Sequence, residues 1–371
     1  MLASTLDIRL ILMVGPTIPL PAPAPLSQAL QSAEVTNDAT SGDGFQLTFT
    51  LGKEAADYNL LLSGVLNPFN RVIVGVLMGA TPEVLIDGII THHQVTPSNE
   101  PGKSTLTVTG KDVSVMLDLE EKNEQYPNQP DSIIVTQLLA QYAVYGLVPQ
   151  PAPTTDVPIE LERVPRQHET DLKFIQRLAQ KNGFVFYVEP VTFGVNTAYW
   201  GPESRAGLPQ PALTTNMAHY SNVKSLNFSN DAMAPVGTEG TFVEPITKTA
   251  IPIPPLPSLK VPPLAAQPAV PQRTQLMRNT ANQNPSSAAV SAVAAATNVP
   301  DAVTGQGELD AVRYGSVLRA RKLVGVRGAG LNYDGFYYVR KVSHRISVGT
   351  YTQSFTLSRE GTGTLTPVVV P

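Results

Sequence analysis

The segment from Glu169 to Val188 constrains the fold most strongly, because all of its local signals agree. Thr170 is a favourable N-cap residue, and Asp171 places a carboxylate in the first turn, where it complements the exposed amides and the helix dipole. Apolar residues then recur at helical spacing, which predicts a helix with one buried face, and these residues are Leu172, Phe174, Ile175, Leu178 and Ala179. Gly183 is suited to a left-handed C-cap. The aromatic and β-branched run Phe184 to Val188 predicts a strand directly after the helix.

A second helix is predicted upstream. Asp131 or Ser132 can serve as its N-cap, and Gly146-Leu147 resembles the Gly183-Phe184 ending of the other helix. Its inward face is made of Ile134, Val135, Leu138, Leu139 and Tyr142. The two helices, near residues 132–145 and 170–182, therefore predict a small α/β unit over residues 121–200.

Strand patterns dominate the rest of the chain. Phe45 to Leu51 alternates apolar and polar residues, and residues 72–77, 84–95 and 104–109 read similarly between turn-forming stretches. Short strands at such spacing without intervening helices predict an antiparallel barrel or sandwich. Strand patterns return at 223–229, 314–326, 336–346 and 350–359, and Asn332 to Gly335 is a hairpin signal.

Two segments are rich in proline. Five prolines between Gly15 and Pro25 predict an extended arm or loop, without helix or central strand. Between Pro245 and Pro271, nine of 27 residues are proline, and residues 272–304 are mostly small and polar. This composition predicts an extended, stiff insertion without a packed core, in which residues 286–296 form at most a weak alanine-rich helix.

Composition limits the function. The 371 residues include 42% hydrophobic and only 15% charged residues, and the net charge is -4. This balance gives no excess of basic residues that would bind nucleic acid. A surface with so few charges is expected to be covered in part by partner proteins. The sequence contains no cysteine, which excludes disulfides, thiolate catalysis and cysteine-ligated metals. No apolar run has the length of a transmembrane helix.

The sequence offers few candidates for metal-binding or catalytic residues. The five histidines show no metal-binding spacing, and surface or partly buried positions explain them better than ligation does; they are His92, His93, His168, His219 and His344. Asp118, Glu120 and Glu121 could form a hydrolase acid pair, but a charged linker explains them better. Arg177 is expected to form an ion pair with Glu169 or Asp171. No catalytic, cofactor-binding or metal-binding residue is assigned.

The segment that opens this section also carries a resemblance. Its pattern resembles the helix-strand signature of the late control protein D family, which comprises the baseplate hubs of contractile phage tails, the hub part of type VI secretion spike proteins and the hubs of related injection systems. The matching residues are Asp171, Leu172, Phe174, Ile175, Arg177, Leu178 and Gly183. The order of elements along the chain agrees with that family, as do the closing strands Asp334 to His344 and Tyr351 to Arg359.

The resemblance implies a mainly β chain with two similar antiparallel β-barrel domains and an α/β domain between them. The expected boundaries are 1–120 for the first barrel, 121–200 for the α/β domain and 201–371 for the second barrel, which is interrupted at about 245–304. The implied function is structural and not enzymatic, and the implied site residues are the structural signature alone. No cofactor is implied.

The implied assembly is a homotrimeric baseplate hub that adapts the hexameric tail tube to the trimeric spike and forms part of the central channel. Its partners would be further copies of itself, the spike protein, the tail tube protein, other baseplate proteins and the tape-measure protein. Such a hub assembles in the bacterial cytoplasm into a phage tail or an injection-system particle.

Two alternatives remain open. One is a tail-associated cell-wall hydrolase that uses Glu120 or Glu121. The other is a β-sandwich that binds glycans or receptors through an aromatic platform, for which the single Trp200 offers little material.

Overall fold

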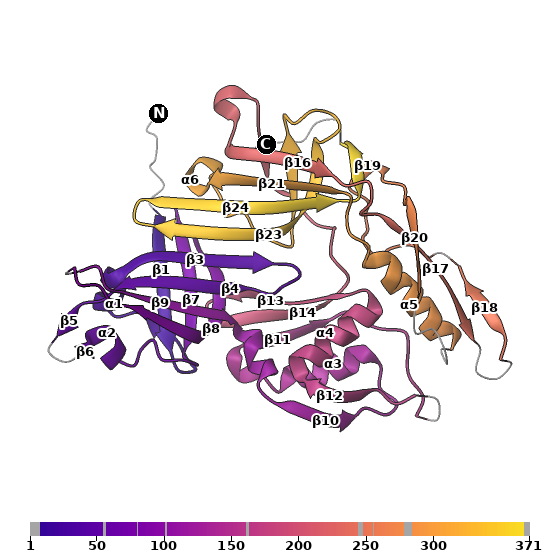
Figure 1. The fold of residues 1–371 in the computed structure, drawn as a ribbon, viewed down its shortest axis with the longest axis horizontal. Coiled ribbons are helices and arrows are strands. Elements are labelled where there is room, and N and C mark those ends of the chain that lie inside the picture. The colour runs from indigo at the N-terminus through magenta and orange to yellow at the C-terminus, as the bar shows by residue number, and fades with distance from the viewer. Residues whose placement is uncertain are drawn as a thin grey trace.

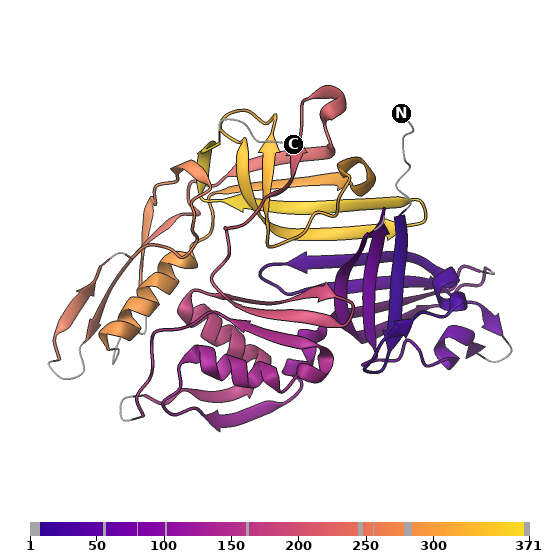
Figure 2. The same ribbon diagram turned by 180° about the vertical axis from the view of Figure 1, so that it is seen from behind.

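The chain forms two β units, an α/β unit between them and an excursion that reaches from the second β unit to the α/β unit (Figures 1 and 2). The computed structural model describes residues 8–54, 57–79, 81–100, 102–160, 163–243, 248–254, 256–277 and 284–366. No helix within these ranges is long and apolar enough to cross a membrane.

The first β unit precedes the α/β unit in the sequence. Its elements are β1 (Ile8–Gly15), β2 (Leu20–Pro21), α1 (Ala24–Ala29), β3 (Leu30–Asp38), β4 (Gly44–Thr50), β5 (Lys53–Glu54), β6 (Asp57–Tyr58), α2 (Asn59–Leu62), β7 (Arg71–Met78), β8 (Thr81–Thr96), β9 (Thr105–Asp112) and the 3-10 helix η1 (Val113–Asp118). Helix α1 corrects the expectation that residues 15–25 exclude helix. It begins at Ala24 with Pro25 in its first turn, where a missing N–H costs nothing.

The α/β unit packs two helices against short strands. Its elements are β10 (Glu121–Gln125), α3 (Asp131–Ala140), η2 (Ala143–Tyr145), β11 (Leu147–Pro151), β12 (Arg166–Thr170), α4 (Asp171–Asn182), β13 (Val185–Thr192) and β14 (Val195–Gly201). Its own core includes Ile134, Leu138, Phe174, Ile175 and Trp200.

The second β unit follows. Its elements are β15 (Gln210–Thr214), η3 (Ala218–Tyr220), β16 (Val223–Asn230), β21 (Val303–Asp310), α6 (Ala311–Tyr314), β22 (Leu323–Arg327), β23 (Gly335–Ser347), β24 (Thr350–Arg359) and β25 (Gly361–Thr364). Strands β22 and β23 pair antiparallel across the hairpin signal at Asn332 to Gly335, and β23 pairs antiparallel with β24 across Val348-Gly349.

Strands of both β units join in one sheet. The order is β16-β21-β24-β23-β3-β4-β9-β8-β7-β1-β2, and the units meet where β3 pairs antiparallel with β23, from Asp38 opposite Lys341 to Ser32 opposite Ser347. One hydrophobic core runs behind both units and contains Val35 and Phe45 of the first and Val342 and Phe355 of the second. The prediction of a mainly β chain with antiparallel sheets and a small α/β part is confirmed. The described strands form no closed barrel, because the hydrogen-bonded path ends at β16 and at β2.

The excursion lies between β16 and β21. Asn230 pairs with Val303 and the Asp231 amide donates to the Ala302 carbonyl, so its two ends are adjacent. It contains β17 (Val236–Val243), β18 (Ala250–Ile253), β19 (Ala265–Pro268), β20 (Arg273–Leu276) and α5 (Pro285–Thr297). The expectation that this segment has no core is wrong, because α5 and the strands bury Phe242, Ile253, Ala288 and Ala292 together. Alanine favours the helix because it loses no side-chain entropy there, and its small side chain lets α5 approach the strands closely.

Helix α5 lies against α4 in the ribbon (Figure 1). The Thr170 hydroxyl caps α4 by accepting from the Lys173 amide, and Gly183 ends it with a φ of 68°. A Cβ at Gly183 would lie 2.9 Å from the Cα of Ala294 in α5. The C-cap glycine therefore serves a second purpose, since it leaves room for the excursion to dock.

Gly183→Ala should destabilise the protein by more than Gly349→Ala does. Gly349 has a φ of 77°, and a Cβ at this position would meet no atom within 4 Å, so it isolates the left-handed backbone cost of about 1–2 kcal/mol. Gly183→Ala should add about 1–3 kcal/mol for overpacking against α5. Urea unfolding measures the difference. Equal losses for the two variants would show that α5 does not dock on this glycine.

Candidate functional site

The signature residues are placed within the α/β unit. Phe174, Ile175 and Leu178 are buried in its core, and Leu172 packs at the edge of that core. Asp171 is fully buried and accepts hydrogen bonds from Lys122 Nζ at 2.6 Å, Tyr142 Oη at 2.7 Å and Gln167 Nε2 at 2.7 Å. This carboxylate thus ties β10, Tyr142 at the N-cap of η2, and β12 to the start of α4, in addition to lying in its first turn.

Arg177 lies on the exposed side of the same helix. Its Nε donates to Glu169 Oε1 at 2.6 Å, and its guanidinium lies 4.9 Å from the centre of the Phe174 ring. Of the two partners considered from the sequence, the structure selects Glu169. Asp171 is unavailable because other donors surround it.

The residues that the hydrolase alternative needs do not form a site. Glu120 and Glu121 are exposed neighbours, the latter on β10, while Asp118 accepts from the Thr170 hydroxyl at 2.6 Å. Trp200 is buried, and its indole N–H donates to the Ile175 carbonyl at 3.1 Å. It therefore offers no platform for a glycan.

The histidines are scattered over the described chain, where no group of His, Asp and Glu could hold a metal ion. His344 differs from the expectation of a surface or partly buried position, because it is completely buried between β3 and β24. Its ring nitrogens lie 2.8 Å from Tyr351 Oη and 3.1 Å from Asn37 Oδ1. Burial, together with the nearby Arg319, lowers the pKa of His344 to about 3.

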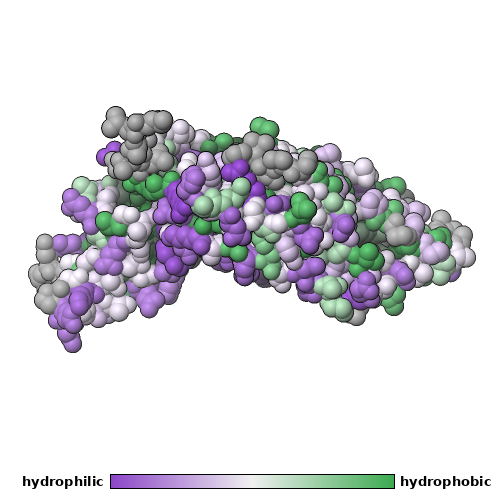
Figure 3. Space-filling view, turned by 90° about the horizontal axis from the view of Figure 1, so that it is seen from above, coloured by the Kyte–Doolittle hydropathy of each residue, from purple (hydrophilic) through white to green (hydrophobic). Residues whose placement is uncertain are grey.

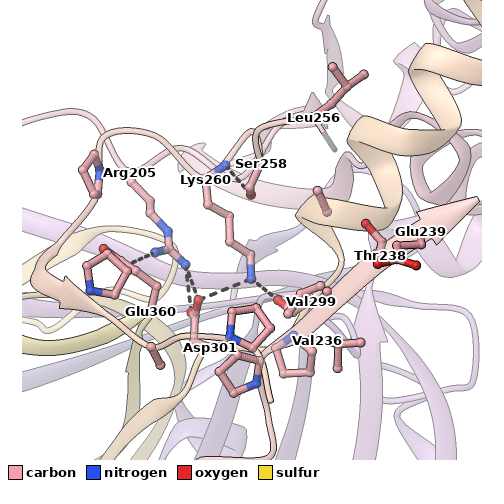
Figure 4. A pocket seen from close by; sticks show the side chains of 18 of the residues that line it. Arg205, Val236, Thr238, Glu239, Leu256, Ser258, Lys260, Val299, Asp301 and Glu360 are labelled. Carbon is pink, nitrogen blue, oxygen red and sulfur yellow. Dashed lines mark hydrogen bonds and ion pairs between the residues drawn. The ribbon is translucent and has the colours of Figure 1, made fainter. Parts of the chain in front are cut away.

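A buried ionic network fastens the excursion to the second β unit (Figure 4). Arg205 is fully buried and donates to Asp301 at 2.8 and 2.9 Å, to Glu203 at 2.8 Å and to Glu360 at 2.8 Å. Lys260 of the excursion donates to Asp301 at 3.3 Å and to the Val299 carbonyl at 2.5 Å. The amides of Leu264 and Ala265 donate to Glu360 at 2.5 and 2.8 Å.

Four of these side chains, Arg205, Lys260, Asp301 and Glu360, line a cavity of about 530 Å³ under the excursion. With Arg340 the network holds three cationic and three anionic side chains, so it needs no external counter-ion. Burial alone raises the pKa of Asp301, but Arg205, Lys260 and Arg340 outweigh burial and hold that pKa well below its usual range. The network thus holds the excursion on the second β unit, and its charged groups are paired with one another by hydrogen bonds and ion pairs.

Sequence reasoning missed this network because its charges lie far apart in the chain. The only local signal is that Lys260 and Asp301 are isolated charges, and that Glu203 and Arg205 form a lone pair of charges, in otherwise uncharged stretches. Such a charge inside an apolar or proline-rich segment is often paired when buried.

Two further buried arginines lie at the other junctions. Arg321 of the second β unit donates to both oxygens of Asp43 in the first, and also to the Asp38 carbonyl at 2.6 Å. Arg71 of the first β unit donates to Asp87 at 2.6 and 2.7 Å and to the Tyr145 carbonyl of the α/β unit at 2.7 Å. Charge-assisted bonds of this kind hold units in a defined orientation.

One face of the joined sheet is polar over eight strands. We call it the polar face; it comprises the alternate residues that point away from the core on β8, β9, β4, β3, β23, β24, β21 and β16. In that strand order they are His92, Gln94, Thr96; Thr105, Thr107, Thr109, Lys111; Gln46, Thr48, Thr50; Ser32, Glu34, Thr36, Asp38; Lys341, Ser343, Arg345, Ser347; Thr350, Thr352, Ser354, Thr356; Gln306, Glu308, Asp310; Ser225, Asn227, Ser229. Serine and threonine make up more than half of these positions.

Three of the four acidic side chains of the polar face lie opposite a basic side chain of a neighbouring strand. Arg345 lies 3.7 Å from Glu34 and Lys341 lies 3.8 Å from Asp38, across the β23–β3 junction. Lys224, at a bulge in β16, lies 3.2 Å from Glu308. Hydroxyls also pair there, as Thr36 and Ser343 do at 3.0 Å.

The two lateral edges of this face are open. Strand β16 ends the sheet and pairs only with β21 among the described strands. At the other side, β7 pairs with residues 81–89 of β8, so His92–Thr96 has a described ladder partner in β9 alone. Open edges of this length are templates for pairing with another chain.

The outer surface is mixed in character. Seen from above, apolar and polar residues are interspersed and the apolar ones lie in small groups (Figure 3). Large exposed apolar residues nevertheless occur on loops, such as Leu208 at 94%, Val348 at 92% and Ile18 at 77% exposure.

Comparison with solved structures identifies the fold. A tail protein from Neisseria meningitidis MC58 superposes with a TM-score of 0.63 and 14% identity over 96% of this chain and 98% of that one. The 43 kDa tail protein of prophage MuSo2 from Shewanella oneidensis gives 0.59 and 14% over 95% and 99%. The E. coli c3393 protein, a type VI secretion component described as similar to the T4 tail proteins gp27 and gp5, gives 0.57 and 13% over 92% and 77%.

This chain has the fold of these tail and type VI secretion proteins. The resemblance inferred from the signature is thereby confirmed, and at these identities the likeness concerns the fold. The model of the Alg8 N-terminal domain matches residues 46–206, which is less than half of the chain. No curated protein matches.

Asp301→Asn should lower the free energy of unfolding by about 3–5 kcal/mol, because it leaves Arg205, Lys260 and Arg340 facing only the buried Glu203 and the partly buried Glu360. Glu308→Gln removes the exposed partner of Lys224 and should cost less than about 1 kcal/mol. Urea unfolding at neutral pH compares the two. In limited proteolysis, Asp301→Asn should also speed cleavage between residues 248 and 277. Equal effects of both substitutions would contradict a fastening role.

Stability should fall in mild acid because of His344. Its pKa is about 3 in the folded chain and about 6.5 when unfolded, so unfolding takes up a proton between these values. Stability is therefore highest above pH 6.5 and decreases by up to about 1.4 kcal/mol per pH unit below it. His344→Gln should remove this slope, whereas the exposed His168→Gln should keep it. Urea unfolding at pH 7 and pH 5 is the measurement, and an unchanged slope in His344→Gln would refute the assignment.

Proposed function

We propose that this chain is the structural baseplate hub of a contractile tail or contractile injection system, and that three copies form a ring around a central channel. The observation that carries the proposal is the continuous sheet, in which the two β units pair through β3 and β23 and leave one strand edge open at each side. The fold shared with tail and type VI secretion proteins supports it.

The open edges differ from each other, so contact between copies would be heterologous. Strand β16 of one chain would pair with His92–Thr96 of β8 in the next, and a heterologous contact forms a closed ring when its rotation closes. Each β unit would then act as one tube-like barrel domain whose wall is completed by neighbours. Three chains supply six such units, which suits an adaptor between a hexameric tube and a trimeric spike.

In this assembly residues 1–120 and 201–371 are the two tube-like domains, and residues 121–200 are the α/β domain. The insertion at about 245–304, which contains most of the excursion, connects the second tube-like domain to the α/β domain. The partners are the spike, the tail tube, other baseplate proteins and the tape-measure protein, and the particle assembles in the bacterial cytoplasm. Neighbouring structures that include complexes of PdpA with VgrG support spike-type partners in general. The role is structural and not enzymatic, and the signature residues, from Asp171 to Gly183, hold the α/β domain together.

Engineered cysteines test the ring, because the natural chain has none. Asn227→Cys in β16 combined with Gln94→Cys or His92→Cys in β8 should give a covalent trimer on oxidation, in at least one of the two registers. The same oxidation of Gln94→Cys with Leu208→Cys, an exposed loop position, should not. Non-reducing electrophoresis and light scattering, with the spike and tube proteins present, are the measurements. A chain that stays monomeric with those partners would refute the proposal.

A further inference from the structure

Two properties of the polar face bear on what could move along it. None of its 28 positions carries a large apolar side chain, although exposed apolar residues are common elsewhere, as at Leu208 and Val348. The same side of the sheet becomes apolar only where other parts of the chain cover it, at Ile89 in the core of the α/β unit and at Tyr338 beside Leu264 of the excursion. The polar face also keeps basic side chains, which are Lys111, Lys341 and Arg345, with Lys224 at its margin.

We propose that the polar face is the wall of a passage for polypeptide cargo, and that its chemistry keeps an unfolded chain from adhering. This inference rests on the proposed ring, in which the polar face would line the channel. An unfolded polypeptide exposes apolar side chains, which adhere to any apolar surface that they can cover. A wall of hydroxyls and amides offers only hydrogen bonds that exchange readily with water, because their net contribution is small.

Charge distinguishes this cargo from nucleic acid. A polyanion adheres to basic side chains by releasing counter-ions, and its phosphate surface gains nothing from the removal of apolar groups from the wall. A wall suited to nucleic acid would lack basic side chains and could keep apolar ones. The polar face instead has basic side chains and lacks apolar ones. Counting Lys224 at its margin, the wall holds four basic and four acidic side chains, so it is close to neutral and lacks the strong net negative charge that would keep a polyanion away from it.

Wall variants in the intact particle test the proposal. One variant carries Thr48→Leu, Thr107→Leu and Thr352→Leu, and a second carries lysine at the same three positions of β4, β9 and β24. A matched control carries Thr197→Leu, Thr238→Leu and Thr274→Leu, which lie on strands outside the polar face. After contraction, mass spectrometry measures the polypeptide released, and a dye assay after nuclease treatment measures protected nucleic acid before contraction.

Leucines on the wall should lower polypeptide release by about tenfold or more, since each offers apolar surface to the passing chain. The lysine variant and the control should stay within about threefold of the natural chain. Blockage by lysine but not by leucine, or protected nucleic acid in natural particles, would overturn the proposal in favour of a nucleic-acid cargo. Release that neither variant alters would show that the polar face lines no passage.

The cysteine experiment distinguishes failure of the proposed ring from failure of the inference about its cargo. If the covalent trimer forms and the wall variants behave as the control does, the ring stands and the inference about cargo fails. If no trimer forms, the proposed function itself fails, whatever the wall variants do.

Discussion

The pairing of β3 with β23 is the contact on which the rest of the structure depends. It joins residues about 300 positions apart, as in the 3.0 Å hydrogen bond between Thr36 and Ser343, and makes one sheet and one core out of two units. Closing so long a loop carries an entropic cost, which the ladder and the core behind it must offset. Arg321 reinforces the junction from the side, because its guanidinium spans Asp43 and the carbonyl of Asp38.

Buried arginines recur at each junction of the molecule. Arg321 joins the two β units, Arg71 joins the first to the α/β unit, and Arg205 joins the excursion to the second. Burying a charge is costly, and a well-packed apolar contact could hold two surfaces with equal strength. A bidentate guanidinium adds directional bonds, which suits a scaffold whose units must keep fixed relative orientations.

The low charge content also has a structural explanation. Charged residues at these junctions form buried ion pairs, as Arg205 and Asp301 do. Most of those on the polar face lie opposite a residue of opposite charge on a neighbouring strand. What remains on that face is mostly serine and threonine, which are compatible with strands and with water. A chain with few free charges on its surface is suited to lie between neighbours and around a passage.

Local elements could be predicted from the sequence, because their causes are local. Thr170, the apolar spacing of α4 and Gly183 act within a few residues of one another, so this helix and its C-cap follow from the sequence alone. Strands β23 and β24 follow in the same way from their strand patterns, and the β22–β23 turn follows from the signal at Asn332 to Gly335. The separate α/β unit followed from the change of hydrophobic period along the chain.

Only the tertiary structure decided which distant residues meet. It buried His344 completely and made Asp171 the acceptor of three side chains. It also set α5 against Gly183 and gathered Arg205, Lys260, Asp301 and Glu360 under the excursion. No local pattern encodes these contacts, because they depend on strand order and register across the whole sheet. The order and register also turned alternate residues of eight separate strands into one continuous polar face.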